Sequence, residues 1–250
     1  MPALPVNFPY NCLRDFFRNF ATMFGDLLSV FYPLNCPACG LLLYKSEKVI
    51  CSQCRFHLPK THFHHDSENM IARQFWGRVP LSAAASLFYF DKKEKVQRLI
   101  HQLKYKGRKE IGVLLGEIYG GDLMESEAYR EVDFIIPVPL HPGRKKRRGY
   151  NQSELFARGL GISMQKKVDP NLLIRHAKTA TQTRKTRFAR WENVNNVFGL
   201  TDAVRPGEGK HFLLADDVIT TGATIEACAQ TLLQIPGAKV SVAAIAYAPH

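Results

Sequence analysis

The chain lacks an uncharged apolar stretch long enough to cross a bilayer. Its most apolar N-terminal stretch, residues 16–31, is interrupted by Arg18 and Asp26, and no small-residue cleavage pattern follows it. We therefore expect neither a signal peptide nor a membrane span, and we expect a cytoplasmic protein. The apolar spacing of residues 12–31 instead predicts an amphipathic helix within an N-terminal segment 1–33.

The chain also lacks the phosphate-binding string G-x-x-x-x-G-K-[ST], which excludes a P-loop nucleotide site. Internal repeats and low-complexity tracts are absent. Apolar residues make up 46% of the composition, which is enough for one substantial core and one small appendage and excludes a disordered chain.

Acidic residues are scarce between residues 144 and 190, where fourteen Lys and Arg face only Glu154 and Asp169. The formal net charge of +12 is concentrated in this segment, since the remainder of the chain is neutral. Such a concentration favours a surface that binds phosphate groups of a nucleotide, a pyrophosphate or a nucleic acid. A solvated surface face is the alternative.

Four of the six cysteines form two C-x2-C pairs separated by eleven residues: Cys36, Cys39, Cys51 and Cys54. Two such turns complete the tetrahedral thiolate shell of a structural Zn²⁺, so the spacing predicts a zinc ribbon over residues 34–60. Two disulfides are the alternative. Several histidines follow without a matching ligand set, and residues 61–79 are expected to be a solvated linker.

Residues 80–250 alternate strand and helix patterns, which predicts an α/β domain with a mostly parallel sheet flanked by helices. The expected strands are residues 83–90, 132–138, 171–175, 210–215 and 239–247. The expected helices are residues 93–104, 111–123, 152–161 and 224–233.

The most informative segment is residues 212–224, where a buried strand leads through Asp216 and Asp217 into a small loop before a helix. Ligands bind at this end of strands in open α/β sheets. Backbone N–H groups and hydroxyls suit a phosphate, and the two carboxylates suit ribose hydroxyls. The expected phosphate-binding residues are Thr220, Thr221, Gly222, Ala223 and Thr224. Paired acids also follow apolar strands in P-loop ATPases and receiver domains.

A second strand ends in the proline-rich turn at residues 137–140, directly before the basic run at residues 144–148. Because Pro137 and Pro139 have no N–H, the donors of an anion site would be the backbone of Val138, Leu140 and His141. A rigid strand end is the alternative.

The loop at residues 216–224 resembles the signature loop of type I phosphoribosyltransferases, which hold 5-phosphoribosyl-1-pyrophosphate (PRPP) with Mg²⁺. Together with residues 33–40, 103–107, 148–152 and 190–198, it resembles the ComF family of competence-associated proteins. That resemblance covers nearly the whole chain.

The resemblance implies an N-terminal zinc ribbon, a phosphoribosyltransferase-type sheet domain and a role in DNA uptake during natural transformation. It implies that Asp216 and Asp217 are the catalytic carboxylates and that residues 176–197 form a hood over PRPP. It also implies a pyrophosphate site built from Val138, Leu140, Arg144, Arg148, Arg187 and Arg190. The alternative is a non-catalytic module that keeps the PRPP loop, binds single-stranded DNA and docks to a DNA-uptake helicase.

Overall fold

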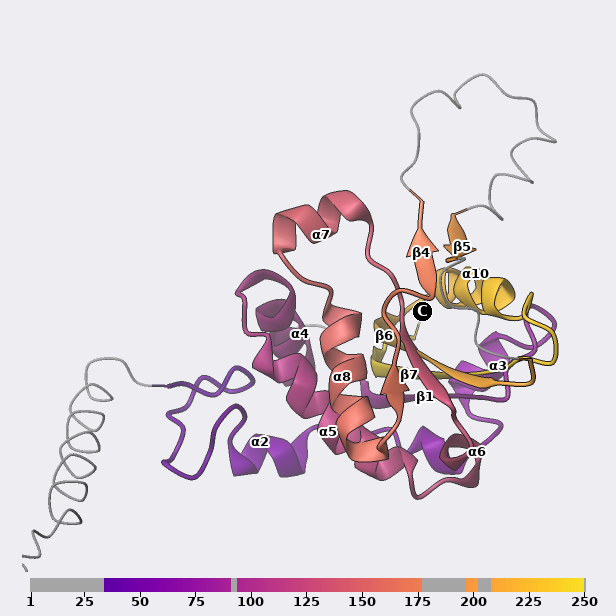
Figure 1. Ribbon diagram of the computed structural model, residues 1–250. Helices are drawn as coiled ribbons and strands as arrows, with labels where there is room; N and C mark the ends of the chain where they lie inside the picture. The colour runs from indigo at the N-terminus through magenta and orange to yellow at the C-terminus, as the bar shows by residue number, and fades with distance from the viewer. Residues whose placement is uncertain (1–33, 91–93, 177–196, 202–207, 250) are drawn as a thin grey trace, which may run out of the picture.

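The computed structural model describes residues 34–90, 94–176, 197–201 and 208–249 (Figure 1). The helix expected within residues 1–33 lies outside the described residues, and so does nearly all of the expected hood. No helix in the described part of the chain has both the length and the apolar content needed to cross a membrane.

A five-stranded sheet with strand order β1-β7-β6-β2-β3 forms the centre of the fold, and every neighbouring pair is parallel. Its strands are β1 (Ala83–Tyr89), β2 (Phe134–Pro137), β3 (Lys167–Val168), β6 (His211–Ile219) and β7 (Lys239–Tyr247). The two central strands, β6 and β7, are apolar runs because parallel strands are covered on both faces. Their register pairs Ala215 with Ala243.

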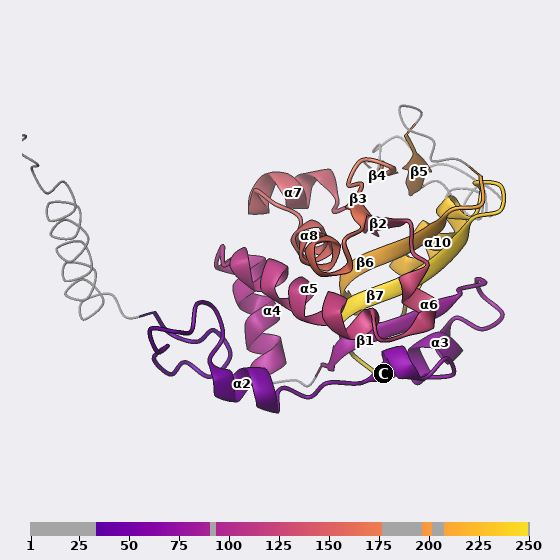
Figure 2. The ribbon, with the colours of Figure 1, turned by 60° about the horizontal axis from the view of Figure 1, so that its bottom comes forward.

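Helices cover both faces of the sheet (Figure 2). On one face lie α4 (Lys95–Tyr105), α5 (Glu110–Leu123) and α8 (Gln152–Met164), which share a core with Leu213 and Ala215 of β6. On the other lie α3 (Met70–Gln74) and α10 (Ala223–Leu232), which share a core with Phe212 and Leu214. The alternation along β6 follows the two-residue period of a strand.

Four short elements complete the sheet domain. Helix α6 (Glu127–Arg130) leads into β2, and α7 (Pro142–Arg148) follows it. The expected strand at residues 171–175 is β4 (Leu173–Arg175), which pairs antiparallel with β5 (Phe198–Leu200) outside the main sheet.

The four-cysteine unit precedes the sheet and contains α2 (Ser52–His57) and an antiparallel bridge between Asn35 and Leu42. The predicted α/β class is confirmed: a mostly parallel sheet flanked by helices, with a small four-cysteine unit before it.

Residues 61–79 are not a solvated linker, contrary to the expectation. They form η1 (Phe63–His65) and α3, and they bury Ile71 and Phe75 in the sheet core. Asn69 explains this packing, because its Oδ1 accepts from the first N–H groups of α3 while its Nδ2 donates to the carbonyl of Ala84 in β1 over 2.8 Å.

Helices α5 and α8 cross where glycines face each other. A Cβ added to Gly116 would lie 2.2 Å from the carbonyl oxygen of Phe156, and one added to Gly159 would lie 2.0 Å from that of Val113. Both neighbours are backbone atoms that cannot rotate away. These glycines therefore set how closely α8, and the site residues at its start, approach the sheet.

Gly159→Ala should lower the free energy of unfolding by about 1–3 kcal/mol, because the added methyl group forces the helices apart. Gly121→Ala is the matched control on α5, since an added Cβ there meets nothing within 4 Å. It should be neutral or stabilise by up to ~1 kcal/mol. Urea denaturation of both variants checks this, and equal effects would contradict the packing argument.

Candidate functional site at the carboxyl ends of β6 and β2

Strand β6 continues through Ile219, so Asp216 and Asp217 lie inside the strand and not in the loop after it. Pairing with the alanine-rich β7 extends the ladder, with Asp216 opposite Ala244. The loop itself is short, because Gly222 is already the N-cap of α10.

The loop and the start of α10 surround a small hollow of about 40 Å³. It is lined by Asp216 and by the segment Val218–Ile225, which contains all five predicted phosphate-binding residues. A water position needs roughly 10–15 Å³ by this measure, so the hollow accommodates about three oxygen-sized groups. That is the size of the free end of a phosphate monoester.

The end of helix α3 and the turn after it contact this loop from outside. Gln74 Nε2 donates to the carbonyl of Thr220 over 2.8 Å, and a guanidinium nitrogen of Arg78 donates to that of Thr221 over 3.1 Å. The C=O and N–H of a trans peptide point in opposite directions. The N–H groups of Thr221 and Gly222 therefore point away from α3 and remain available to a ligand.

Gly222 fits this brace in two ways. Its φ of +75° is a left-handed conformation that favours glycine, and a Cβ there would lie 2.7 Å from the ring of Phe75. Arg78 is itself held over the Phe75 ring and by an ion pair with Glu226 of α10. The contacts of Gln74, Phe75 and Arg78 with the loop were not predicted, because residues 61–79 were expected to be a linker.

Asp216 is held by polar groups from two directions. Its Oδ1 accepts from Ser153 Oγ of α8 over 2.9 Å and from the backbone N–H of Asp217 over 2.8 Å. Burial, reinforced by the neighbouring negative charge of Asp217, nevertheless raises its pKa from 3.8 to about 7. A raised carboxyl pKa beside a hollow is typical of a functional site.

Asp217 forms an ion pair with Lys104 of α4, whose Nζ lies 2.7 Å from Oδ1. Both side chains are mostly buried, with 15% and 21% exposed. Lys104 therefore balances the charge of Asp217 within the protein. The residue segment 103–107 entered the sequence analysis only as part of a family resemblance, so the role of Lys104 was not predicted.

A larger cleft of about 800 Å³ opens between α7 and β4. Its lining includes Leu140, Lys145, Lys146, Asn151 and Arg175. Asn151 is the N-cap of α8, and Ser153 two residues later holds Asp216. The first turn of α8 therefore links the lining of the cleft to that of the phosphate-sized hollow.

The expected donor Val138 does not serve this cleft. Its N–H donates to the carbonyl of Ala215 over 2.9 Å and its carbonyl accepts from Asn151 Nδ2. The side chain is buried in the sheet core. The pairing of β2 with β6 thus extends one residue further than the prolines suggested and uses the N–H that was expected to bind an anion.

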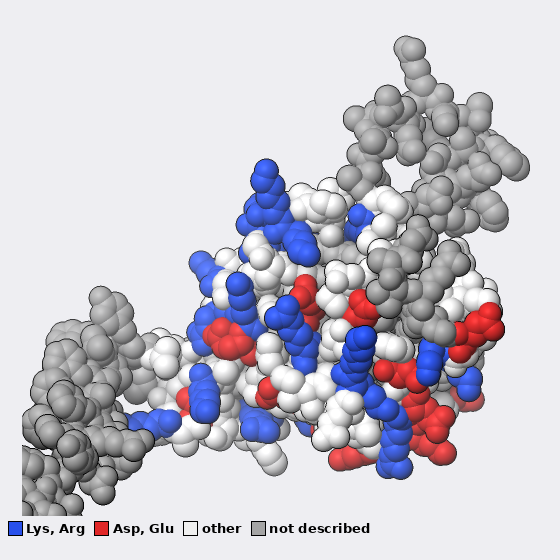
Figure 3. All heavy atoms as spheres, viewed as in Figure 1, with Lys and Arg blue, Asp and Glu red and all other residues white. Residues whose placement is uncertain are grey.

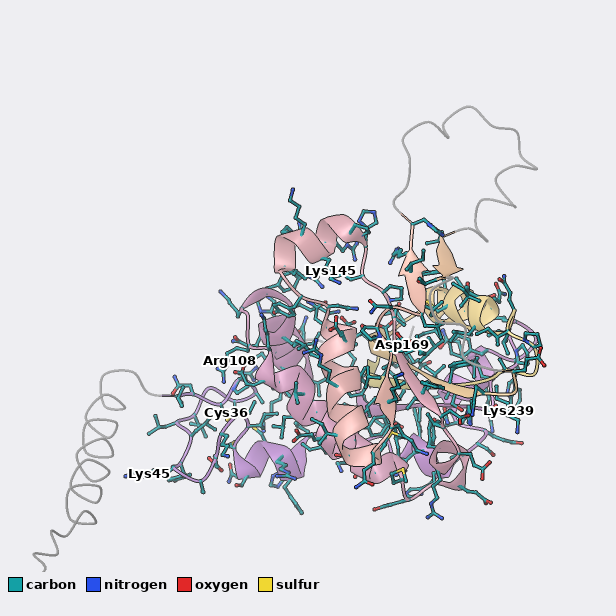
Figure 4. All side chains as sticks on the ribbon, in the orientation of Figure 1. Cys36, Lys45, Arg108, Lys145, Asp169 and Lys239 are labelled. Atoms are coloured by element: carbon teal, nitrogen blue, oxygen red, sulfur yellow. The ribbon has the colours of Figure 1, made fainter. Side chains whose placement is uncertain are left out.

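The basic run at residues 144–148 lies in the helix α7, which begins at Pro142 and ends at Arg148 before the left-handed C-cap Gly149. Figure 3 shows Lys and Arg side chains projecting from the molecule at α7, and Figure 4 shows Lys145 at the top of the fold, above Cys36 in this view. The side chains of residues 144–147 are exposed and form no ion pair within the described residues. Arg187 and Arg190 lie outside the described residues.

Arg148 at the end of α7 differs from its neighbours. It donates to Gln152 Oε1 over 2.8 Å, and its guanidinium lies 5.1 Å from the ring centroid of Tyr105. The Tyr105 side chain is 59% exposed, so an aromatic face stands beside the basic helix.

The four predicted metal-ligating cysteines meet as expected, and their Sγ atoms all lie within 4.8 Å of one another. Cys39 and Cys51 are 3.7 Å apart at Sγ, far beyond a disulfide bond, and the described cysteines are free thiols. Gly40 after the first pair has a φ of +82°. The cluster has the donor set and size to hold a metal ion.

Several known proteins are similar to this chain in sequence. DNA utilization protein YhgH of Escherichia coli O6:H1 is 33% identical over 202 residues, which cover 79% of this chain and 84% of that protein. The chain belongs to the ComF family. Competence protein F of Haemophilus influenzae is 25% identical to this ComF chain and spans 87% of it and 99% of its own length. Competence protein ComFC of Bacillus subtilis is 24% identical over 78% of this chain and 82% of its own length.

No protein-family model matches this ComF chain. Two solved adenine phosphoribosyltransferases align with it only loosely. The enzyme from Saccharomyces cerevisiae aligns at 15% identity and a TM-score of 0.34, over 56% of this chain and 69% of its own. The second aligns at 12% identity and a TM-score of 0.35, over 64% of this chain and 82% of its own. TM-scores this low do not assign a fold or a function to this chain.

Asp216→Asn should raise the free energy of unfolding at pH 8 by about 1–2 kcal/mol. The folded-state pKa lies above the unfolded value, so ionisation of Asp216 removes stability as the pH rises from about 4 to 7. Asparagine does not ionise. The increase in unfolding free energy is smaller than the pKa shift alone would give, because Asp216 is partly open to solvent.

Urea denaturation at pH 8 and pH 4 checks this. The stabilisation should nearly disappear at pH 4, where the folded-state carboxyl is protonated and the unfolded-state carboxyl is about half protonated. A gain of equal size at both pH values would contradict the assignment.

Proposed function

We propose that this protein binds PRPP with Mg²⁺ at the carboxyl end of β6. The observation that carries the proposal is the braced hollow, which combines a helix N-terminus, outward N–H groups and threonine hydroxyls beside a carboxylate. Helix N-termini are anion sites because their first N–H groups have no intrahelical partner. The 5-phosphate would lie there, against residues 220–224.

The ribose and the metal ion would lie next to Asp216 and Asp217. Carboxylate oxygens accept from vicinal hydroxyls and are also the ligands that Mg²⁺ prefers. Lys104 must release Asp217, at least in part, for this to happen. Its Nζ then becomes available to a phosphate oxygen.

The pyrophosphate would extend into the cleft beside α7. The backbone at Leu140 and the cations Lys145, Lys146 and Arg175 support this placement. Phosphoribosyl transfer at this site would break the bond between the anomeric carbon and pyrophosphate while an acceptor forms the new one. Neutralising the leaving group is the main electrostatic requirement of such a step.

We further propose that the four cysteines hold a structural Zn²⁺. Four thiolates complete a tetrahedral shell and leave no position for a catalytic water. The described thiols are unbonded and clustered, which supports metal over disulfides. The names of the relatives, DNA utilization protein and competence protein, support a role for this chain in DNA uptake or use.

Asp217→Asn should weaken Mg²⁺-dependent PRPP binding by about tenfold or more, which corresponds to about 1.4 kcal/mol. The reason is that the asparagine amide is uncharged and has only one acceptor oxygen, so it cannot contact both the ribose hydroxyls and the metal ion as a carboxylate does. Isothermal titration calorimetry with PRPP and MgCl₂ measures the affinity. Glu131→Gln removes an equal charge from an exposed position before β2 and should leave the affinity unchanged. Absence of PRPP binding in the wild type would overturn the proposal.

Binding of single-stranded DNA is the second candidate function, and α7 favours it. Four exposed cations on one short helix, next to the exposed ring of Tyr105, combine backbone neutralisation with a stacking surface. Phosphate contacts make such binding strongly dependent on salt.

The double variant Lys145→Ala, Lys146→Ala should weaken binding of an oligothymidylate and reduce the magnitude of its log–log salt slope by about 1.4, or ~0.7 per lost contact. Fluorescence anisotropy across a salt series measures both. The control Lys48→Ala, Lys239→Ala removes two exposed cations that lie away from α7. Equal loss in the two double variants would reject α7 as the contact surface.

A further inference from the structure

Two histidines and a glutamate from distant parts of the chain meet beside the end of α5. His64 and His65 belong to η1, and Glu125 follows α5. One ligand-capable atom of each lies within 4.8 Å of the others. The sequence analysis found no partner set for these histidines, because Glu125 reaches them only through the fold.

His64 carries an unsatisfied polar atom. The residue is only 7% exposed, and its Nδ1 is buried without a hydrogen-bond partner. Its ring packs edge-on against Tyr119, with centroids 6.0 Å apart. A buried ring nitrogen without a partner is unfavourable and calls for a bound group at this position.

An ion pair alone does not explain the cluster. His65 Nε2 and Glu125 Oε2 are 3.6 Å apart, which is too long for a hydrogen bond, and their side chains are 52% and 66% exposed. Exposed pairs of this kind contribute little to stability. The nearby carboxylate of Asp122 is already paired with Lys60 over 2.7 Å.

We propose that His64, His65 and Glu125 bind a divalent transition-metal ion, at a site separate from the four cysteines. Two imidazole nitrogens and one carboxylate oxygen form a donor set that suits Zn²⁺ and Co²⁺. The exposure of His65 and Glu125 leaves the remaining coordination positions to water. The ion would tie η1 to the end of α5 and so fix the segment that leads into α3.

Cobalt titration of the full-length protein, purified with its zinc and freed of loosely bound metal, tests the proposal. Thiolate-bound Co²⁺ gives intense near-ultraviolet charge-transfer bands, whereas a site of nitrogen and oxygen ligands gives only weak visible bands. The wild type should bind one additional Co²⁺ per chain with weak bands and no charge transfer. Equilibrium dialysis gives the stoichiometry.

His65→Ala and Glu125→Gln should each weaken this additional binding by about tenfold or more, since each removes one of three protein ligands. Both side chains are exposed, so these variants should fold. His57→Ala is the matched control, because His57 is also exposed and belongs to the preceding helix α2. It should bind the additional ion as the wild type does.

The proposal fails if no additional Co²⁺ binds, which is the result expected if a buried water is the partner of His64. It also fails if His65→Ala and Glu125→Gln bind the additional ion as tightly as the wild type does. It also fails if the additional ion produces charge-transfer bands, because the ion would then occupy the cysteines. Zinc content before titration reports on the cysteine site independently.

Discussion

The contact between α3 and the loop after β6 is the constraint on which the candidate site depends. Gln74 and Arg78 donate hydrogen bonds to the carbonyls of that loop, and the Phe75 ring occupies the space that a side chain at Gly222 would need. Planar peptides then direct the intervening N–H groups toward the ligand side. Residues far apart in the sequence thus determine the orientation of the N–H groups of Thr221 and Gly222.

The sheet and its principal helices could be predicted because their pattern is local. Apolar runs identified β1, β2 and β7, and amphipathic spacing identified α4 and α5 within a few residues. The end of β6 was placed too early, since Asp216 and Asp217 do not look like strand residues. The strand continues past them because its pairing with β7 runs on through Ile219, with Asp216 opposite Ala244.

What could not be predicted are the contacts made across the fold. Lys104 meets Asp217, and Ser153 meets Asp216, through the packing of α4 and α8 on one face of the sheet. Residues 61–79 looked like a linker because they are rich in histidine and polar groups, yet Asn69 ties them to β1. The cysteine cluster was predictable because its spacing alone brings the thiolates together.

The Lys104–Asp217 pair gives the site an internal counterion. With the ammonium in place, the two acids do not repel each other at full strength. On the proposed function, a Mg²⁺ ion would have to displace this ammonium to reach Asp217, so ligand entry would be an exchange of cations. The freed lysine would carry its charge toward the polyphosphate, and the same side chain would serve first as a counterion and afterwards as a ligand contact.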